Sequence, residues 1–299
     1  MPDDSEKAPR YFIGATAFEA PPLAAGFYVV ATPIGNLRDI TLRALETLAA
    51  ADVILCEDTR TSARLLDHFG IRTPRKPLHE HNERERADAI VADLQRGSAI
   101  ALISDAGTPL LSDPGFPVVR AVRQAGLPVY AVPGASALLS ALAIAGLPTD
   151  SFSFHGFLPA KAVARGKAIA ALATRSETLV FYESPRRLGD ALAALAEGFG
   201  ENRDAAVALE LTKRFERVSR GTLGALAAEY GAGETKGEAV IVVGGAAEPT
   251  APAEADWMAA LEAELAGQPL RAAVDAVTGR FGLKRKEVYD AALAFKAEK

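Results

Sequence analysis

Short apolar runs that alternate with helical patterns are the feature that most constrains the fold of this chain. Between Gly26 and Ala145, stretches typical of β-strands are each followed by residues with the 3.6-residue spacing of an amphipathic helix. The run Ala99–Ile103 is apolar at every position, as expected for a strand that is covered on both faces. This alternation predicts right-handed βαβ crossovers and a largely parallel sheet.

Punctuation by Gly, Pro and charged residues predicts four regions in the 299 residues. Residues 1–25 are polar and then rich in Ala and Pro, so we expect a flexible leader. Residues 26–148 are expected to form an N-terminal α/β domain, which ends where Gly146 and Pro148 break the pattern, and residues 149–247 a second α/β domain. After a linker rich in Pro and Ala, residues 256–299 show helical patterns without a strand signal, which predicts a small helical module.

Composition excludes several classes of protein. A single cysteine, Cys56, permits no intramolecular disulfide, and one Cys with four His does not suit a structural zinc site. The chain contains no apolar run of about 18 residues, and acidic residues near Met1 do not fit a signal peptide, so we expect a cytoplasmic protein that does not span a membrane. The net charge of -5 argues against a uniformly basic surface but leaves a local basic patch open.

Four loops rich in Gly and Pro directly follow predicted strands of the first domain. In open parallel α/β sheets, ligands bind beyond the carboxyl ends of the strands, where glycines permit close approach and helix N-termini offer free N–H groups. One such loop is also what an ordinary turn looks like, so the prediction of a binding edge depends on all four together. They cover residues 32–37, 56–60, 104–115 and 133–136.

Commoner motifs fit these loops poorly. The first loop lacks the G-x-G-x-x-G of a dinucleotide fold, and the one stretch that resembles a P-loop has Lys161 where the first glycine is needed. Residues 134–138 begin like a nucleophile elbow but lack its final glycine, so we expect Ser136 to cap a helix or contact a ligand. His79 and His81 fit a solvated loop better than a metal site, and we expect no metal.

Taken together, the loops and several later motifs resemble the ribosomal RNA ribose 2′-O-methyltransferases of the tetrapyrrole methylase superfamily, the branch that modifies a cytidine in the decoding region of small-subunit (16S) rRNA. The resemblance covers both α/β domains in order, to about residue 245, and leaves out the first 25 residues. Small-molecule methylases of this superfamily typically carry Gly-Gly-Asp-Pro in the third loop, whereas Ile-Ser-Asp-Ala here favours the RNA branch. The resemblance rests on residues 30–37, 56–60, 104–115, 132–138, 154–159, 181–188, 210–213, 220–222 and 236–239.

This resemblance implies two α/β domains with a cofactor cleft between them, S-adenosylmethionine as the cofactor, 16S rRNA within the small ribosomal subunit as the substrate, and a homodimer. Asp105 also stands out by itself, because an acidic residue after an apolar strand needs a partner, either a ligand group or the backbone of an Asx turn. By position, the resemblance implies cofactor contacts from Pro33, Ser104, Asp105, Ala106, Leu111, Ser136, Ala137, Glu183, Leu211 and Ala239.

A neutral ribose hydroxyl is a poor nucleophile, so a base or a positive field near the developing oxyanion should help its methylation. No residue is assigned as the base, and each candidate has a solvated ion pair or a helix cap as its alternative role. The candidates are Glu57 and Asp58 as proton acceptors, and Arg60, Arg186 and Lys213 as positive groups near phosphates or the oxyanion.

Positive charge concentrates in the helical module at Lys284, Arg285 and Lys286, which we interpret either as an RNA-contacting helix start or as a solvated helical face. Two other functions stay open from the sequence. One is a small-molecule tetrapyrrole methylase, and the other is a cofactor-binding ribosome assembly factor that has no catalytic turnover.

Overall fold

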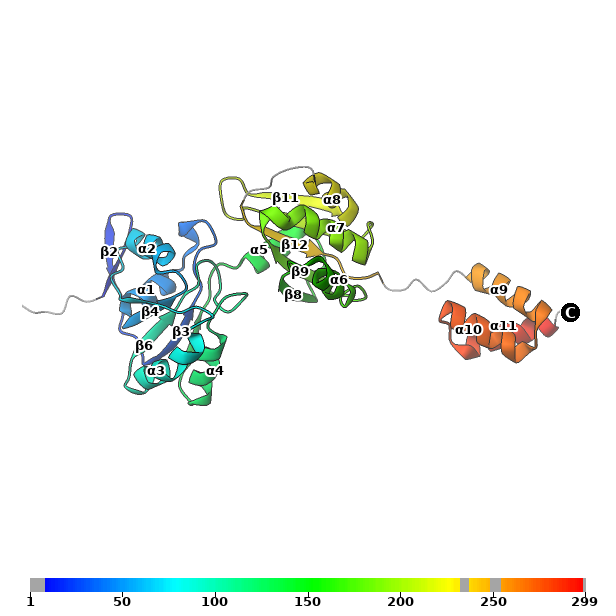
Figure 1. Cartoon of the computed structure of the whole chain (residues 1–299), viewed down its shortest axis with the longest axis horizontal. Coiled ribbons are helices and arrows are strands. Elements are labelled where there is room, and N and C mark those ends of the chain that lie inside the picture. The colour runs from blue at the N-terminus through cyan, green and yellow to red at the C-terminus, as the bar shows by residue number, and fades with distance from the viewer. Residues whose placement is uncertain (1–8, 232–236, 248–253, 298–299) are drawn as a thin grey trace, which may run out of the picture. The chain divides into compact units, whose positions relative to one another are not determined.

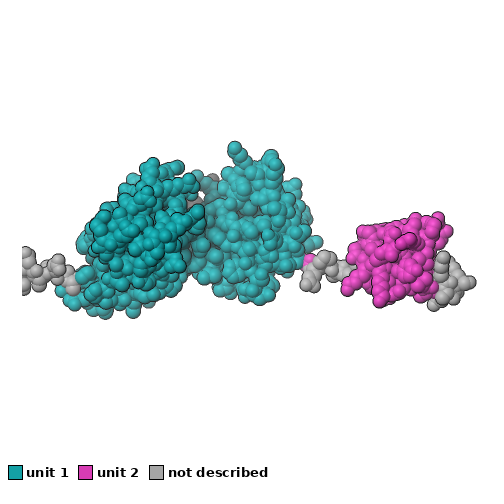
Figure 2. Space-filling view, turned by 90° about the horizontal axis from the view of Figure 1, so that it is seen from below, with its two compact units in different colours: residues 1–246 teal, residues 247–299 magenta. Residues whose placement is uncertain are grey.

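The computed structural model describes residues 9–231, 237–247 and 254–297. The chain forms two compact units, one of residues 1–246 and one of residues 247–299 (Figure 2). Unit 1 contains two five-stranded sheets and a short hairpin, and the described part of unit 2 is helical. The α/β class predicted from the alternating pattern is therefore confirmed.

The first sheet is parallel and has the strand order β5-β4-β6-β3-β7. Strand β3 pairs in parallel with β6 and β7, and β4 pairs in parallel with β5 and β6. Strand β6 is buried at all four positions, and its residues alternate between two hydrophobic cores, one on each face of the sheet. The strands are β3 (Gly26–Val30), β4 (Val53–Cys56), β5 (Arg75–Pro77), β6 (Ala99–Leu102) and β7 (Val129–Val132).

Two pairs of helices cover the two faces of the first sheet (Figure 1). Leu45 of α1 and Leu66 of α2 belong to one core, whereas Ile90 of α3 and Val122 of α4 belong to the other. Burial on both faces explains why the strand residues are continuously apolar. The helices are α1 (Leu42–Ala50), α2 (Thr59–His68), α3 (Glu83–Gln95) and α4 (Phe116–Gln124), with the short 3-10 helix η1 (Leu37–Asp39) before α1.

The expectation of a flexible leader over residues 1–25 was wrong for residues 10–19. Strands β1 (Arg10–Ile13) and β2 (Thr16–Glu19) form an antiparallel hairpin there. Tyr11 is only 3% exposed and joins the core that α1 and α2 cover, and the Phe12 N–H donates to the carbonyl of Phe69 at 2.8 Å. Apolar side chains in an otherwise polar stretch thus dock on a helical layer, whereas residues 1–8 lie outside the described part of the chain.

The second sheet is mixed, with the order β11-β10-β12-β9-β8, in which β8 and β9 pair in parallel and the other pairs are antiparallel. One of its faces is covered by α6, α7 and α8, which share a core with this sheet. The elements are β8 (Phe152–Phe157), α6 (Ala162–Ala170), β9 (Thr178–Glu183), η2 (Pro185–Arg187), α7 (Leu188–Phe199), β10 (Asp204–Leu209), β11 (Arg217–Thr222), α8 (Leu223–Gly231) and β12 (Ala239–Val243).

Helix α5 (Ala137–Ala145) links the two sheets. It follows β7 of the first sheet in the chain, yet Leu138 and Leu142 pack in one buried cluster with Val180 and Val242 of the second sheet (Figure 1). The sequence boundary at residue 148 would assign α5 to the first domain. By its packing, however, α5 belongs with the second sheet, because its apolar face covers the side of that sheet opposite α6, α7 and α8.

Unit 2 is a small bundle of three described helices, α9 (Glu254–Gly267), α10 (Leu270–Phe281) and α11 (Arg285–Ala297). Trp257 and Leu261 of α9 pack with Val274 of α10 and Val288 of α11 in a core of their own. The helical character predicted for this end of the chain is confirmed. None of the described helices combines the length and the apolar surface that crossing a bilayer requires.

Candidate functional site

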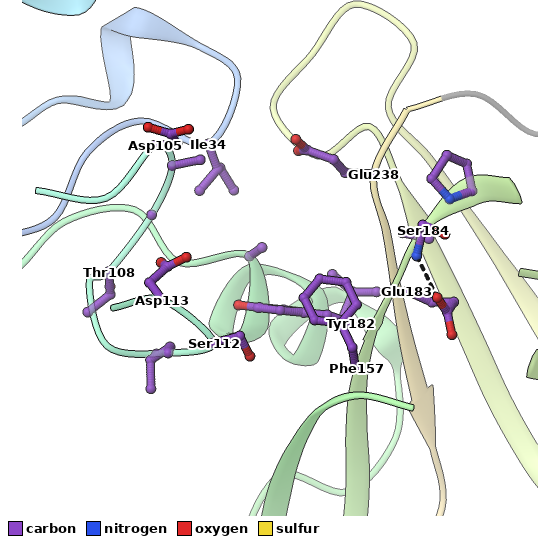
Figure 3. Close-up of a pocket in the computed structure, with 17 residues that line it drawn as sticks. Ile34, Asp105, Thr108, Ser112, Asp113, Phe157, Tyr182, Glu183, Ser184 and Glu238 are labelled. Atoms are coloured by element: carbon purple, nitrogen blue, oxygen red, sulfur yellow. Dashed lines mark hydrogen bonds between the residues drawn. The ribbon is translucent and has the colours of Figure 1, made fainter. Parts of the chain in front are cut away.

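A cavity of about 360 Å³ lies in unit 1 between the carboxyl-end loops of the first sheet and the ends of β9 and β12 (Figure 3). Its volume falls in the range of small-molecule sites. The first half contributes Ile34, much of the β6–α4 loop (residues 103–115) and Ala137, and the second half contributes Phe157, residues 182–185 and residues 238–240. Of the four predicted loops, those at residues 32–37 and 104–115 line this cavity, whereas those at residues 56–60 and 133–136 do not.

The β6–α4 loop is held in an unusual backbone conformation. Leu110 and Ser112 have φ angles of 77° and 70°, in the left-handed backbone region that residues other than glycine rarely adopt. The loop is also joined to the loop after β3, because Thr32 and Gly107 exchange backbone hydrogen bonds of 2.8 and 3.1 Å. Strained backbone that its surroundings hold in place is a feature of ligand sites.

Three carboxylates gather at this edge. Burial raises the pKa of Asp113 to about 6; the Ser104 hydroxyl opposes this rise, and the charges of Glu57 and Asp105 add to it. Partial burial, and then the charge of Asp105, raises the pKa of Glu57. Burial also raises the pKa of Asp105, although its Oδ1 accepts the Asp58 N–H at 3.3 Å. So many carboxylates around one cavity favour a positively charged ligand.

Strand β9 presents Tyr182 and Glu183 from the opposite side. The Leu138 N–H at the start of α5 donates to the Tyr182 hydroxyl oxygen at 3.2 Å, and burial raises the pKa of this phenol. The hydroxyl thus keeps its proton, and it points toward the loop that carries Ser112 and Asp113 (Figure 3). This proton can be donated to a ligand or to a carboxylate in the cavity.

The Glu183 side chain is fully buried. One of its oxygens accepts the Ser184 N–H at 2.8 Å, and the Arg187 guanidinium lies 3.2 Å from the other. Burial raises the pKa of this carboxyl group, whereas the Ser184 N–H and Arg187 lower it. Glu183 therefore fixes the end of β9 and the turn into η2, which form one wall of the cavity.

The structure separates the predicted cofactor-binding residues into two groups. Four of the ten do not line the cavity. Pro33 is buried in the loop after β3, the Ser104 carbonyl accepts a hydrogen bond from the Thr32 hydroxyl at 3.2 Å, Ser136 caps α5 through the Leu139 N–H, and Leu211 packs in the core beside α5. The residues that line the cavity are Asp105, Ala106, Leu111, Ala137, Glu183 and Ala239. A cofactor contact stays a prediction for all ten.

The predicted catalytic candidates are more scattered. Asp58 caps α2 by accepting the Arg60 N–H at 2.8 Å, and it also forms an exposed ion pair with the Arg60 side chain at 3.5 Å. That arrangement is the cap and ion pair given above as the alternative role. Glu57 lies beside Asp105 and Asp113 but does not line the cavity. Arg186 is exposed in η2, next to the lining residue Pro185.

Lys213 lies close to the cavity through an acidic partner. Its ammonium group is 2.9 Å from Glu210 and 3.3 Å from Glu238, and Glu238 lines the cavity. Burial lowers the pKa of Lys213, but the two carboxylates raise it by more. The net effect is a raised pKa, so the group stays positive. With its charge already matched by two carboxylates, Lys213 is better suited to holding the loop than to stabilising an oxyanion.

Sequence reasoning missed Asp113, Tyr182 and Glu238 as lining residues. Asp113 belongs to the same strand-end loop as Asp105, so an acidic residue near the end of that loop was the available signal. Tyr182 and Glu238 gave no such signal, because nothing in the sequence tells which strand ends of the second domain face the first. Within residues 9–231, 237–247 and 254–297, no group of three or more His, Cys, Asp and Glu side chains is placed to hold a metal ion.

Comparison with protein families matches most of the chain. The family described as Tetrapyrrole (Corrin/Porphyrin) Methylases matches residues 26–227, and the RsmI C-terminal HTH domain matches residues 251–296. A protein of Mesorhizobium japonicum named ribosomal RNA small subunit methyltransferase I is 50% identical over 270 residues, which cover 89% of this chain and 92% of that protein. The protein of the same name from Escherichia coli O157:H7 is 46% identical over 271 residues, with coverages of 89% and 94%.

Solved structures share the fold of unit 1. The uroporphyrin-III-C-methyltransferase of Thermus thermophilus aligns with a TM-score of 0.53 and 24% identity, over 74% of this chain and 94% of that one. A structure of that enzyme described as a complex with S-adenyl homocysteine gives a TM-score of 0.51 at 20% identity, over 73% and 97%. The methyltransferase CobJ gives 0.56 at 20% identity, over 75% and 95%.

Proposed function

The chain belongs to the tetrapyrrole (corrin/porphyrin) methylase family, in the group whose members are named ribosomal RNA small subunit methyltransferase I, and we propose that it methylates the RNA of the small ribosomal subunit. The observation that carries this proposal is the two-sided cavity, with Asp105 and Asp113 on one wall and the ends of β9 and β12 on the other. Relatives with the same name align over nearly their whole length, through unit 2 as well as unit 1.

S-adenosylmethionine is the proposed cofactor, and the residues present fit it. The molecule carries a positive sulfur and an ammonium group, which suit the negative side of the cavity at Asp105 and Asp113. Ile34, Leu111 and Val240 offer apolar contact to its adenosine part. When bound, the cofactor supplies an electrophilic methyl group.

The proposed acceptor is the ribose 2′-oxygen of a cytidine in the decoding region of 16S rRNA, within the small subunit. Support for this target comes from the motifs of the RNA branch, including Ile-Ser-Asp-Ala at residues 103–106, and from the names of the relatives. A ribose hydroxyl needs to lose its proton during the transfer, which places a base near the methyl group.

Asp113 is the residue we assign as that base. With S-adenosylmethionine bound in the cavity, the Asp113 carboxylate would accept the proton that the ribose hydroxyl loses when its oxygen takes the methyl group. A pKa of about 6 leaves Asp113 ionised at neutral pH yet more basic than an ordinary aspartate. The Tyr182 hydroxyl faces the same loop and positions this carboxylate or the substrate (Figure 3).

The other candidates keep supporting roles in this proposal. Glu57 strengthens the basicity of Asp113 through its negative charge. Arg60 and Arg186, both exposed, are available to RNA phosphates. Asp58 orders the start of α2, and Lys213 holds Glu210 and Glu238 together.

Unit 2 is proposed as a second contact with RNA. Lys284, Arg285 and Lys286 are exposed at the start of α11, and Arg285 is fixed by Asp275 at 2.8 Å. An exposed cluster of cations at a helix start suits phosphate contacts that add affinity without reading bases. We also propose a homodimer, from the resemblance, and a cytoplasmic location, where small subunits would be available.

Methyl transfer from radiolabelled S-adenosylmethionine tests the function. The full-length protein is offered isolated small subunits, naked 16S rRNA and a porphyrin in parallel, and labelled RNA is digested with alkali, which a 2′-O-methyl group resists. We expect label from subunits in a single alkali-resistant dinucleotide that contains cytidine. Label on a base or on the porphyrin, or bound cofactor without transfer, would contradict the proposal.

A further inference from the structure

The loop between β10 and β11 (residues 210–216, the β10–β11 loop) carries an exposed aromatic ring near the cavity. Phe215 is 74% exposed, although burial of a phenylalanine is normally favourable. The guanidinium of Arg214 lies 5.5 Å from the centre of this ring. An aromatic ring and an arginine thus project together from one loop into solvent.

The β10–β11 loop is internally braced. Glu210 and Thr212 have φ angles of 51° and 65°, in the left-handed region. The Lys213 N–H donates to the Glu210 carbonyl at 3.0 Å, and the Thr212 N–H donates to the Glu216 carboxylate at 2.6 Å. A strained backbone held by its own side chains presents Phe215 in a defined position, so a ligand would not have to order the loop.

Lys213 and Glu238 attach this loop to the cavity. Lys213 pairs with Glu238, which lines the cavity (Figure 3). The Glu238 N–H also donates to the Glu210 carboxylate at 3.2 Å. On the other side, Lys213 lies against the loop after β3, where a Cβ on Gly35 would come within 2.6 Å of the Lys213 Cγ. Lys213 therefore contacts both halves of the site, and the exposed Arg214 and Phe215 follow it directly in the chain.

This combination fits an unpaired nucleobase. Single-stranded RNA is recognised largely by stacking of splayed bases on aromatic rings and arginine planes. Resting on the proposed function, we propose that Phe215 stacks on a base next to the methylated nucleotide, while Arg214 contacts a neighbouring phosphate. Stacking would hold the RNA strand so that the target ribose enters the cavity.

Four variants of the full-length protein test this contact: Phe215→Leu, Phe215→Trp, Arg214→Gln and, as a control, Val163→Ala. Leucine keeps an apolar side chain but removes the ring, whereas tryptophan keeps a stacking surface. Val163 is 75% exposed on α6 and makes an equally accessible control. Each variant is assayed for methylation of isolated small subunits under kcat/KM conditions, for cofactor affinity by calorimetry, and for oligomeric state by sedimentation.

We expect Phe215→Leu to lower kcat/KM for subunits by about 10-fold or more, the size of one stacking contact, with unchanged cofactor affinity. Phe215→Trp and Val163→Ala should remain within about twofold of the wild type. When kcat/KM for subunits is measured at a series of salt concentrations, Arg214→Gln should reduce the steepness of the plot of log kcat/KM against log salt concentration by about 1, the value of one phosphate contact.

Two results would overturn the contact and leave the function standing. The first is that the wild-type enzyme methylates subunits and the Phe215→Leu variant methylates them equally well. The second is a Phe215→Leu variant whose loss follows a change in oligomeric state, because the ring would then cover a second copy. A wild-type protein that methylates no RNA would instead contradict the proposed function itself.

Discussion

The two walls of the cavity are built differently. The first sheet contributes loops, where Leu110 and Ser112 hold left-handed backbone and Asp105 and Asp113 carry charge. The second sheet contributes the ends of two strands, Tyr182 of β9 and Ala239 of β12, and its lining carboxylates, Glu183 and Glu238, are each paired with a cation. A parallel sheet must leave each strand through a loop at its carboxyl edge, whereas adjacent antiparallel strands of a mixed sheet can form a continuous wall.

This difference suggests a division of roles. Loops supply the groups whose charge and exact placement decide the chemistry, and the strands supply a fixed surface against which a ligand is held. Changes in the β6–α4 loop should therefore reduce reaction or cofactor binding, while changes in β9 should have smaller effects. The predictions below test this division, and the largest expected effect comes first.

Replacement of Asp113 by Asn should cost the most. An amide of the same size cannot accept the ribose proton. We therefore expect the rate constant of methyl transfer, measured in single-turnover methylation of small subunits, to fall by about 10²-fold to 10⁴-fold. Circular dichroism should show an unchanged fold. Activity close to that of the wild type would remove Asp113 as the base and weaken the assignment of chemistry to the loops.

The same carboxylate predicts a pH profile. Only the deprotonated form accepts a proton, and burial raises the pKa of Asp113 to about 6, so wild-type activity should fall as pH falls below about 6 and level off above it. In the Asp113→Asn variant, the residual activity should lack this acidic limb. A limb at the same pH in both proteins would assign it to another group.

Cofactor affinity should depend on Asp105. We expect Asp105→Ala to weaken binding of S-adenosylmethionine by about 10-fold to 100-fold in calorimetry, because a charged hydrogen bond is lost. The protein should stay folded, since this carboxylate accepts a single hydrogen bond within the described residues, from the Asp58 N–H at 3.3 Å. Unchanged affinity would leave Asp105 as a loop-structuring residue.

The basic residues of unit 2 belong to neither wall of the cavity, so their replacement can be compared with changes in both walls. Combined replacement of Lys284, Arg285 and Lys286 by Ala should reduce methylation of subunits by about tenfold at moderate salt, because up to three phosphate contacts are lost. Cofactor affinity should not change, since these residues belong to a separate compact unit. Equal activity of the triple variant would mean that these residues form a solvated helical face.

The smallest effect is expected in the strand wall. Tyr182→Phe removes the oxygen that accepts the Leu138 N–H, and the net cost of one hydrogen bond is about 1 kcal/mol. Thermal unfolding should shift down by a few degrees, and activity should fall only severalfold. A loss as large as that of Asp113→Asn would give Tyr182 a direct part in proton transfer and break the division between loops and strands.

The sequence predicted the first sheet well because its central strands have a strong signal. Ala99–Ile103 is apolar throughout, and β6 is buried on both faces. Strands β5 and β11 give almost no signal in the sequence, since both are edge strands with polar or charged residues and no clear alternation. Helix α6 gives little periodicity in the sequence, because Ile169 is its only buried residue.

The site was predictable where the chain itself marks it. Strand-end loops identified Asp105, Ala106 and Leu111, and all three line the cavity. The sequence could not separate a lining residue from a supporting one, because Ser104 and Ser136 stand at the same strand ends but bond to the Ala106 carbonyl and the Leu139 N–H. That distinction depends on side-chain direction, which only the three-dimensional packing determines.

Helix α5 limits how this protein can be divided. A fragment ending at residue 148 would carry the apolar face of α5 without the second sheet that covers it, and the complementary fragment would expose Val180 and Val242. Cutting within residues 133–136 would instead leave α5 with the second sheet but would open the chain directly before Ala137, which lines the cavity. The ligand site and the joint between the halves therefore share one segment of chain, so insertion, splitting or circular permutation there would disturb assembly and binding together.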